Sequence, residues 1–129
     1  MDEKSKDRIK ANGEVFTPSW LVEEMLGKLP EDVWEPDKTF LEPAAGDGNF
    51  VEVILREKVR RGHDPYQALQ TTYAIELMHD NVVKMKWRAI EAVGLKVDDE
   101  AGREIVDRNL RQGNFLEIDD VWEFFQNNK

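Results

Sequence analysis

The sequence of 129 residues contains no cysteine, which excludes disulfide bonds and thiolate metal sites. It has no apolar run near the roughly 18 residues that a membrane-spanning helix requires. Its first eight residues are mostly charged, which is unlike a secretory signal. We therefore expect no membrane association and a cytoplasmic location.

Positive charge is also scarce, because 18 Lys and Arg residues face 27 Asp and Glu residues and the net charge is −9. DNA binding draws on cations that neutralise phosphates, so nucleic acid is a possible but disfavoured partner for the isolated chain. His63 and His79 have no partners at metal-ligand spacing, so we predict no metal site and place both at the surface or at a helix end. Two basic clusters are better explained as solvated helix faces: Arg56, Lys58, Arg60 and Arg61, and Lys84, Lys86 and Arg88.

Alternating helix and strand patterns predict one α/β domain with a mostly parallel sheet of three to four strands and helices on both faces. We expect a flexible tail over residues 1–12 and the domain over 13–129. Strand patterns occur at 39–41, 71–75 and, more weakly, 109–112. One helical pattern opens at Thr17-Pro18-Ser19, with Thr17 as the cap and Pro18 in the first helical position, and ends at Pro30. Further helical patterns occur at 49–61, 64–69, 79–93 and 98–107, with Gly62 and Gly94 as stops. Segment 121–125 fits a helix or a strand.

The segment 40–50 predicts a strand, a glycine loop and a helix. Gly46 and Gly48 let the backbone approach a ligand closely, and a helix start presents free N–H groups. Glu76 ends the second predicted strand, where an acidic side chain accepts hydrogen bonds from ribose hydroxyls. Taken singly, each feature leaves a plainer alternative open: a tight turn for the loop, and a solvated glutamate for Glu76.

Four segments, in order, resemble the motifs of the adenine-N6 DNA methyltransferases, a family of class I S-adenosylmethionine-dependent enzymes. They are residues 13–18, 41–50, 73–77 and 113–116. The resemblance implies a truncated Rossmann-like class I methyltransferase fold and S-adenosylmethionine as the cofactor, with S-adenosylhomocysteine as its product. Short proteins that look like this one occur in bacteriophages, which would place the chain in the host cytoplasm.

The resemblance assigns the first two motifs to the methionine part of the cofactor. Phe16 and Thr17 would cover it and bind its carboxylate, with Pro18 beside them. The second motif would hold the amino and carboxylate groups, through the side chain of Glu42 and the loop backbone. The residues implied there are Glu42, Pro43, Ala44, Gly46, Asp47 and Gly48.

The last two motifs would bind the nucleoside. Glu76 would accept the ribose hydroxyls and Leu77 would pack on the adenine ring. Asn114 would accept a hydrogen bond from the adenine amino group through its side-chain oxygen, although the family more often has aspartate there. Phe115 would stack on the ring.

The sequence departs from the family at the catalytic motif, an Asp- or Asn-Pro-Pro-aromatic tetrapeptide that holds the flipped adenine. It contains no Pro-Pro, and its last proline is Pro65. Asn127 or Asn128 beside Phe125 is a weak substitute, so the catalytic residues stay unknown. Two functions remain open: an adenine-N6 DNA methyltransferase, or a cofactor-binding module that senses, sequesters or degrades S-adenosylmethionine or works with a partner chain. A vestigial pocket in an interaction protein is disfavoured, because all four ligand motifs keep usable residues.

A sheet this small leaves its first strand with an unpaired edge, and exposed edges invite pairing with another chain. The aromatic residues Trp122, Phe124 and Phe125 belong either to the core or to a contact surface. We therefore expect a homodimer that uses residues near 115–125.

Overall fold

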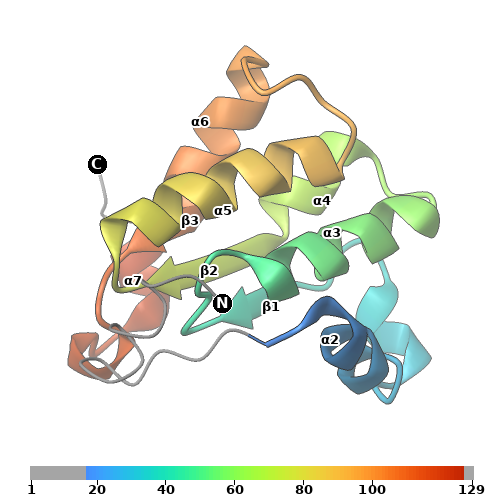
Figure 1. The fold of residues 1–129 in the computed structure, drawn as a ribbon, viewed down its shortest axis with the longest axis horizontal. Helices are drawn as coiled ribbons and strands as arrows, with labels where there is room; N and C mark the ends of the chain where they lie inside the picture. Colours follow the sequence, from blue (N-terminus) through green and yellow to red (C-terminus); the bar gives the residue numbers. More distant parts are fainter. Residues whose placement is uncertain (1–16, 127–129) are drawn as a thin grey trace.

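The structure is a computed structural model that describes residues 17–126, and it shows an open, all-parallel, three-stranded sheet with helices (Figure 1). Strands β1 (Phe40–Glu42), β2 (Thr72–Glu76) and β3 (Leu110–Gln112) lie side by side in chain order. Leu41 pairs with Tyr73, and Ile75 pairs with Arg111. The predicted α/β class and its three strand segments are confirmed, with each strand shifted by about one residue.

Helices fill every connection between strands. The helix predicted to run to Pro30 ends at Leu26, because Lys28 and Leu29 turn back to Met25 and Leu26 through i to i+3 hydrogen bonds. Within residues 17–126, every helix is too short or too polar to cross a bilayer. In chain order the helices are α2 (Ser19–Leu26), the 3-10 helix η1 (Glu31–Trp34), α3 (Asn49–Arg60), α4 (Pro65–Gln70), α5 (His79–Ala92), α6 (Glu100–Asn109), the 3-10 helix η2 (Phe115–Glu117) and α7 (Val121–Gln126).

The main core lies between one face of the sheet and helices α3 to α6. Ala74 of β2 and Leu110 of β3 point into it, as the alternation of side chains along a strand requires. Helices α3 and α5 run side by side over this face, and α2 packs on α3 (Figure 1). The helices contribute Val51, Leu55, Ala68, Leu69, Val82, Met85, Ala89, Ile90, Ile105 and Val106.

The opposite face of the sheet is covered by α7. Tyr73 lies one residue from Ala74 and therefore faces away from the main core, where its ring contacts those of Trp122 and Phe125 at 5.1 and 5.0 Å. Arg111 on the same face donates hydrogen bonds to two carbonyl oxygens of α7, at 2.9 and 3.1 Å. Segment 121–126 is thus a helix, and the sheet has helices on both faces, as predicted.

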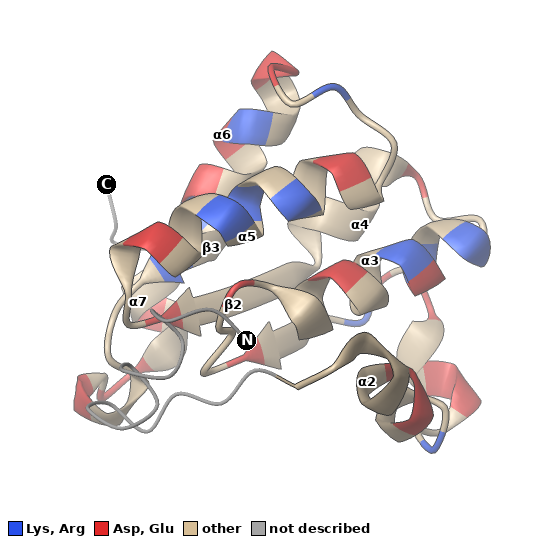
Figure 2. Cartoon of the chain, in the orientation of Figure 1, with Lys and Arg blue, Asp and Glu red and all other residues tan. Residues whose placement is uncertain are grey.

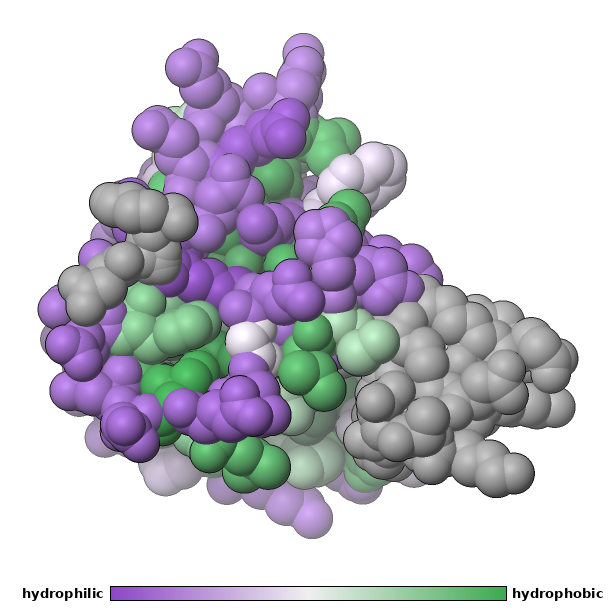
Figure 3. Space-filling view, turned by 90° about the vertical axis from the view of Figure 1, so that its left-hand side faces the viewer, coloured by the Kyte–Doolittle hydropathy of each residue, from purple (hydrophilic) through white to green (hydrophobic). Residues whose placement is uncertain are grey.

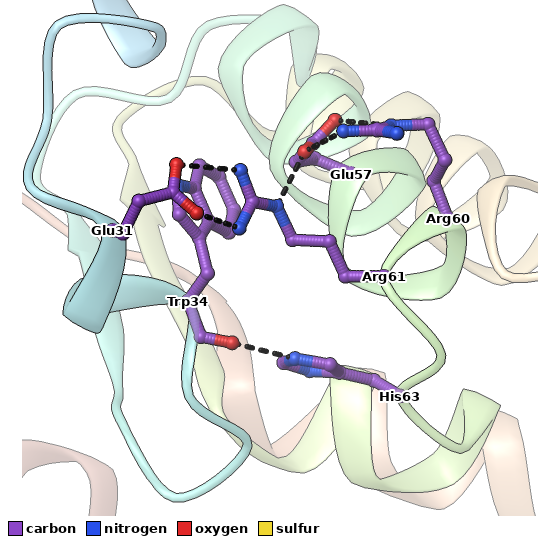
Figure 4. A network of polar contacts seen from close by, with 6 residues as sticks. All are labelled: Glu31, Trp34, Glu57, Arg60, Arg61 and His63. Atoms are coloured by element: carbon purple, nitrogen blue, oxygen red, sulfur yellow. Dashed lines mark hydrogen bonds and ion pairs between the residues drawn. The ribbon is translucent and has the colours of Figure 1, made fainter.

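A polar network fastens η1 to the end of α3 (Figure 4). Arg61 donates to Glu31 at 2.9 Å and to Glu57, and its guanidinium lies 5.0 Å from the ring of Trp34. The hydrogen bond from Arg61 lowers the pKa of Glu31. His63 is buried after α3 and donates from Nε2 to the carbonyl oxygen of Trp34 at 2.7 Å. Of the two positions predicted for His63, the helix end is confirmed, because the residue follows the last turn of α3, and the surface is wrong, because the ring is buried.

The prediction that Lys58 lies on a solvated helix face is also wrong. Its side chain is fully buried, and Nζ donates to the carbonyl oxygen of Thr71 and to the hydroxyls of Thr71 and Thr72, at 3.2, 2.7 and 2.7 Å. Lys58 lies seven residues after Val51 and four after Ile54, which places it on the inner face of α3. The helical period outweighs the charge of the residue here.

Candidate functional site

The candidate site is built on the loop that follows β1. Gly46 and Gly48 have φ of +59° and +100°, which L-residues rarely adopt. The N–H of Ala45 donates to the carbonyl oxygen of Ile75 at 2.9 Å, so the loop lies against the end of β2. A Cβ on Gly48 would meet the Cα of Met85 at 3.1 Å. Glycine at this position therefore lets α3 begin directly against α5.

Glu76 ties this loop to the end of β2 and the start of α5. Its side chain is only 5% exposed, and its Oε1 accepts a hydrogen bond from the Gly46 N–H at 2.8 Å. Its Oε2 accepts from the N–H of Met78 at 3.0 Å and from Nδ2 of Asn81 at 3.1 Å. Burial rules out the alternative that Glu76 is a solvated glutamate.

Thr17, in the described part of the N-terminal motif, contacts Asn49, the first residue of α3. The Nδ2 of Asn49 donates to the carbonyl oxygen of Thr17 at 2.6 Å. Pro18 follows as the exposed N-cap of α2, and no side-chain hydrogen bond caps this helix start. Phe16 lies outside the described residues. The structure thus brings the Thr17 carbonyl beside the glycine loop. The predicted cap at Thr17 is wrong, because Pro18 occupies the N-cap position and the helix begins at Ser19.

The last motif joins the site through the backbone of Glu76. The Gly113 N–H donates to the Glu76 carbonyl oxygen at 3.0 Å, which brings the residues after β3 alongside the end of β2. Asn114 uses its Oδ1 to accept from the Leu116 N–H at 3.0 Å and so caps η2. Leu77 and Phe115 are 47% and 38% exposed, which leaves both apolar side chains available to a ligand.

Acidic residues lie in the loop after β1 and at the carboxyl ends of β1 and β2, where the cartoon is red (Figure 2). Glu42 ends β1 and accepts a hydrogen bond from the Ala44 N–H at 3.1 Å, and both Pro43 and Ala44 are exposed. Glu76 ends the neighbouring strand β2, and Asp47 in the loop lies 3.2 Å from Arg88, so Glu42 and Glu76 are the strand-end carboxylates that make no ion pair with this arginine. Such a site favours a ligand with positive charge.

One contact of the loop escaped the sequence analysis, which assigned Arg88 to a solvated face. Arg88 on α5 donates hydrogen bonds to the carbonyl oxygen of Asp47 and to the side chain of Asn49. The available signal was its spacing, because Arg88 lies three residues after Met85, which packs against Gly48.

Figure 3 shows the side of the molecule on which the strands end, with hydrophobic side chains gathered over its lower half and hydrophilic ones around them. Beside Gly113, a cavity of about 540 Å³ is lined by Asn114 and by acidic residues that include Asp119, Asp120 and Glu123. A separate cavity of about 300 Å³, lined by Leu26, Trp34 and Val53 among others, lies between α2, η1 and the far half of α3. The glycine loop and the second cavity are therefore at opposite ends of α3.

Comparisons of the chain with protein-family models, curated proteins and solved structures found no match. Over residues 17–126, histidine and acidic side chains form no group of three or more that is suited to a metal ion. A function for the chain has to be inferred from the contacts of its own residues.

Proposed function

We propose that the chain binds S-adenosylmethionine at the carboxyl ends of β1 and β2, in a Rossmann-like domain of the class I methyltransferase type. The 2.8 Å hydrogen bond between the Gly46 N–H and Glu76 carries this proposal. This hydrogen bond joins the glycine loop after β1, where two φ angles are positive, to the glutamate that ends the parallel strand β2. Open α/β sheets bind nucleotide-like ligands at this position.

The chemistry of the ligand fits the residues that meet there. The sulfonium and the amino group are cationic, and the carboxylates of Glu42 and Glu76 lie at the strand ends beside the loop. A carboxylate has about four acceptor positions, and protein donors use three on Glu76, so a ribose hydroxyl takes the remaining one or displaces the Gly46 N–H. Leu77 and Phe115 supply apolar surface for the adenine.

Methyl transfer to an adenine of DNA is the activity we propose where a catalytic group is supplied, and that group stays unassigned. A second candidate is cofactor binding without transfer, to sense, sequester or degrade S-adenosylmethionine or to act with a partner chain. The acidic cavity beside Gly113 favours the second candidate, because phosphates are repelled by Asp119, Asp120 and Glu123. DNA methylation would then require a second chain that carries the positive charge.

Isothermal calorimetry with S-adenosylmethionine tests the binding. We expect the wild-type chain to bind and Glu76→Gln to weaken the affinity about tenfold or more, because a charged acceptor of ribose hydroxyls is lost. Glu91→Gln, at an exposed position on α5, serves as the matched control and should bind like the wild type. A folded wild-type chain that shows no binding at millimolar ligand contradicts the proposal.

Transfer of a tritiated methyl group to adenine-containing DNA separates the two candidate functions. Binding with transfer supports the methyltransferase. Binding without transfer, with or without cleavage of the cofactor, supports the module.

A further inference from the structure

Arg88 contacts the glycine loop from the side of α5. We propose that Arg88 is a positioning residue, which fixes residues 46–48 in the shape that receives the ligand and couples this loop to Thr17. That the loop receives a cofactor rests on the proposed function. The control of the loop by Arg88 does not rest on the proposed function, because it follows from contacts within the protein alone.

The guanidinium of Arg88 makes four contacts with one short stretch of chain. Its Nη1 donates to the carbonyl oxygen of Asp47 at 3.2 Å and lies 3.2 Å from the Asp47 carboxylate. Its Nη2 donates to Oδ1 of Asn49 at 2.7 Å, and its Nε donates to Glu52 at 2.6 Å. A planar fork is suited to such a set of acceptors, whereas an ammonium group is not.

The contact with Asn49 carries the effect of Arg88 on to the N-terminal motif. The Oδ1 of Asn49 accepts from Arg88 while its Nδ2 donates to the carbonyl oxygen of Thr17. A flipped amide would place its NH₂ group against the guanidinium and its oxygen against a carbonyl, so Arg88 sets the amide orientation that binds Thr17.

Arg88 also divides the acidic groups of the site into two sets. It neutralises Asp47 and Glu52, which border the loop and the first turn of α3. Glu42 and Glu76, at the strand ends, make no ion pair with Arg88. Removal of Arg88 leaves the Asp47 carboxylate without its cation and the Asp47 carbonyl oxygen without the donor Nη1, in the loop between Gly46 and Gly48.

Amide hydrogen exchange of the unliganded protein tests the positioning directly. We expect Arg88→Met to speed exchange at Gly46 and Gly48 about tenfold or more, because hydrogen bonds to a charged group are lost, while Ala89 in the core of α5 changes little. Arg88→Lys should fall between Arg88→Met and the wild type. Lys84→Met, which also removes an exposed cation from α5, should leave the loop unchanged.

Two outcomes of the exchange experiment would overturn the inference. One is unchanged exchange at Gly46 and Gly48 in Arg88→Met. The other is equal acceleration at the loop and at Ala89, which would mean that Arg88 supports only the global stability of the fold.

Calorimetry with S-adenosylmethionine then tests the consequence for the ligand. Arg88→Met should weaken binding about tenfold, and Lys84→Met should not. Asn49→Ala, which removes the link to Thr17 but keeps the Asp47 contact, should weaken binding without faster exchange at Gly46. Unchanged affinity in Arg88→Met would show that the contacts of Arg88 with the loop have no effect on binding. Unchanged affinity in Asn49→Ala would show the same for the contact between Asn49 and Thr17. If the wild-type chain does not bind S-adenosylmethionine, the proposed function is wrong. The exchange data would still show whether Arg88 positions the loop.

Discussion

The buried ammonium group of Lys58 forms its hydrogen bonds with neutral oxygens and not with a carboxylate. Three oxygens of Thr71 and Thr72 accept hydrogen bonds from Nζ, and the centroid of the Phe40 ring lies 4.8 Å from Nζ. The threonine hydroxyls in turn donate to backbone carbonyls at the end of α4, which fixes their lone pairs toward the lysine. These contacts satisfy the group, but burial still lowers the pKa of Lys58 from 10.5 to about 7.

This lowered pKa predicts a stability that depends on pH. Between about pH 7 and 10.5 the unfolded chain binds more protons than the folded chain, so the free energy of unfolding rises with pH, by at most about 1.4 kcal/mol per pH unit. Urea unfolding at pH 7.5 and 9.0 measures the rise. Tyr66 does not interfere, because its hydrogen bond to Asp99 raises its pKa.

Lys58→Met should abolish the rise, since the group that titrates is gone, and Lys84→Met should keep it because Lys84 is exposed. An equal rise in Lys58→Met and in the wild type would show that another group is responsible.

The sequence predicts the conformation of single residues where it depends on their neighbours in the chain. It does not predict the burial or contacts of residues whose partners are distant in the chain. Gly62 and Gly94 stop their helices with φ of +96° and +85°, as their place after each helical pattern indicates. The burial of Lys58 and the contacts of Arg88 with the glycine loop were missed, because a charge near other charges was assigned to solvent. For both residues, the spacing from buried neighbours on the same helix was the better indicator.

The element that most constrains the site is the turn from the glycine loop into α3. Gly48→Ala should lower the free energy of unfolding by more than about 2 kcal/mol, because a methyl group at φ of +100° is strained and would also meet the backbone of Met85. Gly62→Ala is the matched control, since its φ is +96° and nothing lies within 4 Å of the added carbon. It should cost only the strain, about 1 kcal/mol.

Urea unfolding of Gly48→Ala and Gly62→Ala measures both costs, and their difference isolates the packing of α3 on α5. Equal costs for the two variants would mean that α3 moves away from α5 without penalty.

Strand and helix order was predictable, because alternating periodicities and turn residues are local features of the sequence. The ends of the elements were less predictable. The helix that begins at Ser19 stops before Pro30. Segment 121–126, which fitted a helix or a strand, is a helix whose start is capped by the Asp120 side chain and whose Phe125 ring contacts that of Tyr73. Likewise, the proximity of Thr17 to Asn49 depends on α2 packing against α3, which no local pattern encodes.

At the scale of the whole molecule, apolar surface near α7 favours the homodimer that the sequence suggests. Leu116 and Trp122 are 90% and 45% exposed, and within residues 17–126 strand β1 pairs only with β2. We expect light scattering after size-exclusion chromatography to give twice the mass of one chain, because the exposed aromatic surface is buried between copies.

Trp122→Ser should shift this dimer toward the monomer. Trp87→Ser, at another exposed tryptophan on α5, should leave the mass unchanged. A wild-type chain that stays monomeric at high concentration would contradict the prediction of a dimer.

The most direct test of the central claim is a titration of the ¹⁵N-labelled chain with S-adenosylhomocysteine, followed by NMR. We predict saturable shifts at the amides of Gly46, Gly48, Leu77 and Gly113, which come from three separate segments that the fold brings together. A spectrum that does not change at millimolar ligand, or changes confined to the cavity between α2, η1 and α3, would contradict a nucleoside site at the carboxyl ends of β1 and β2.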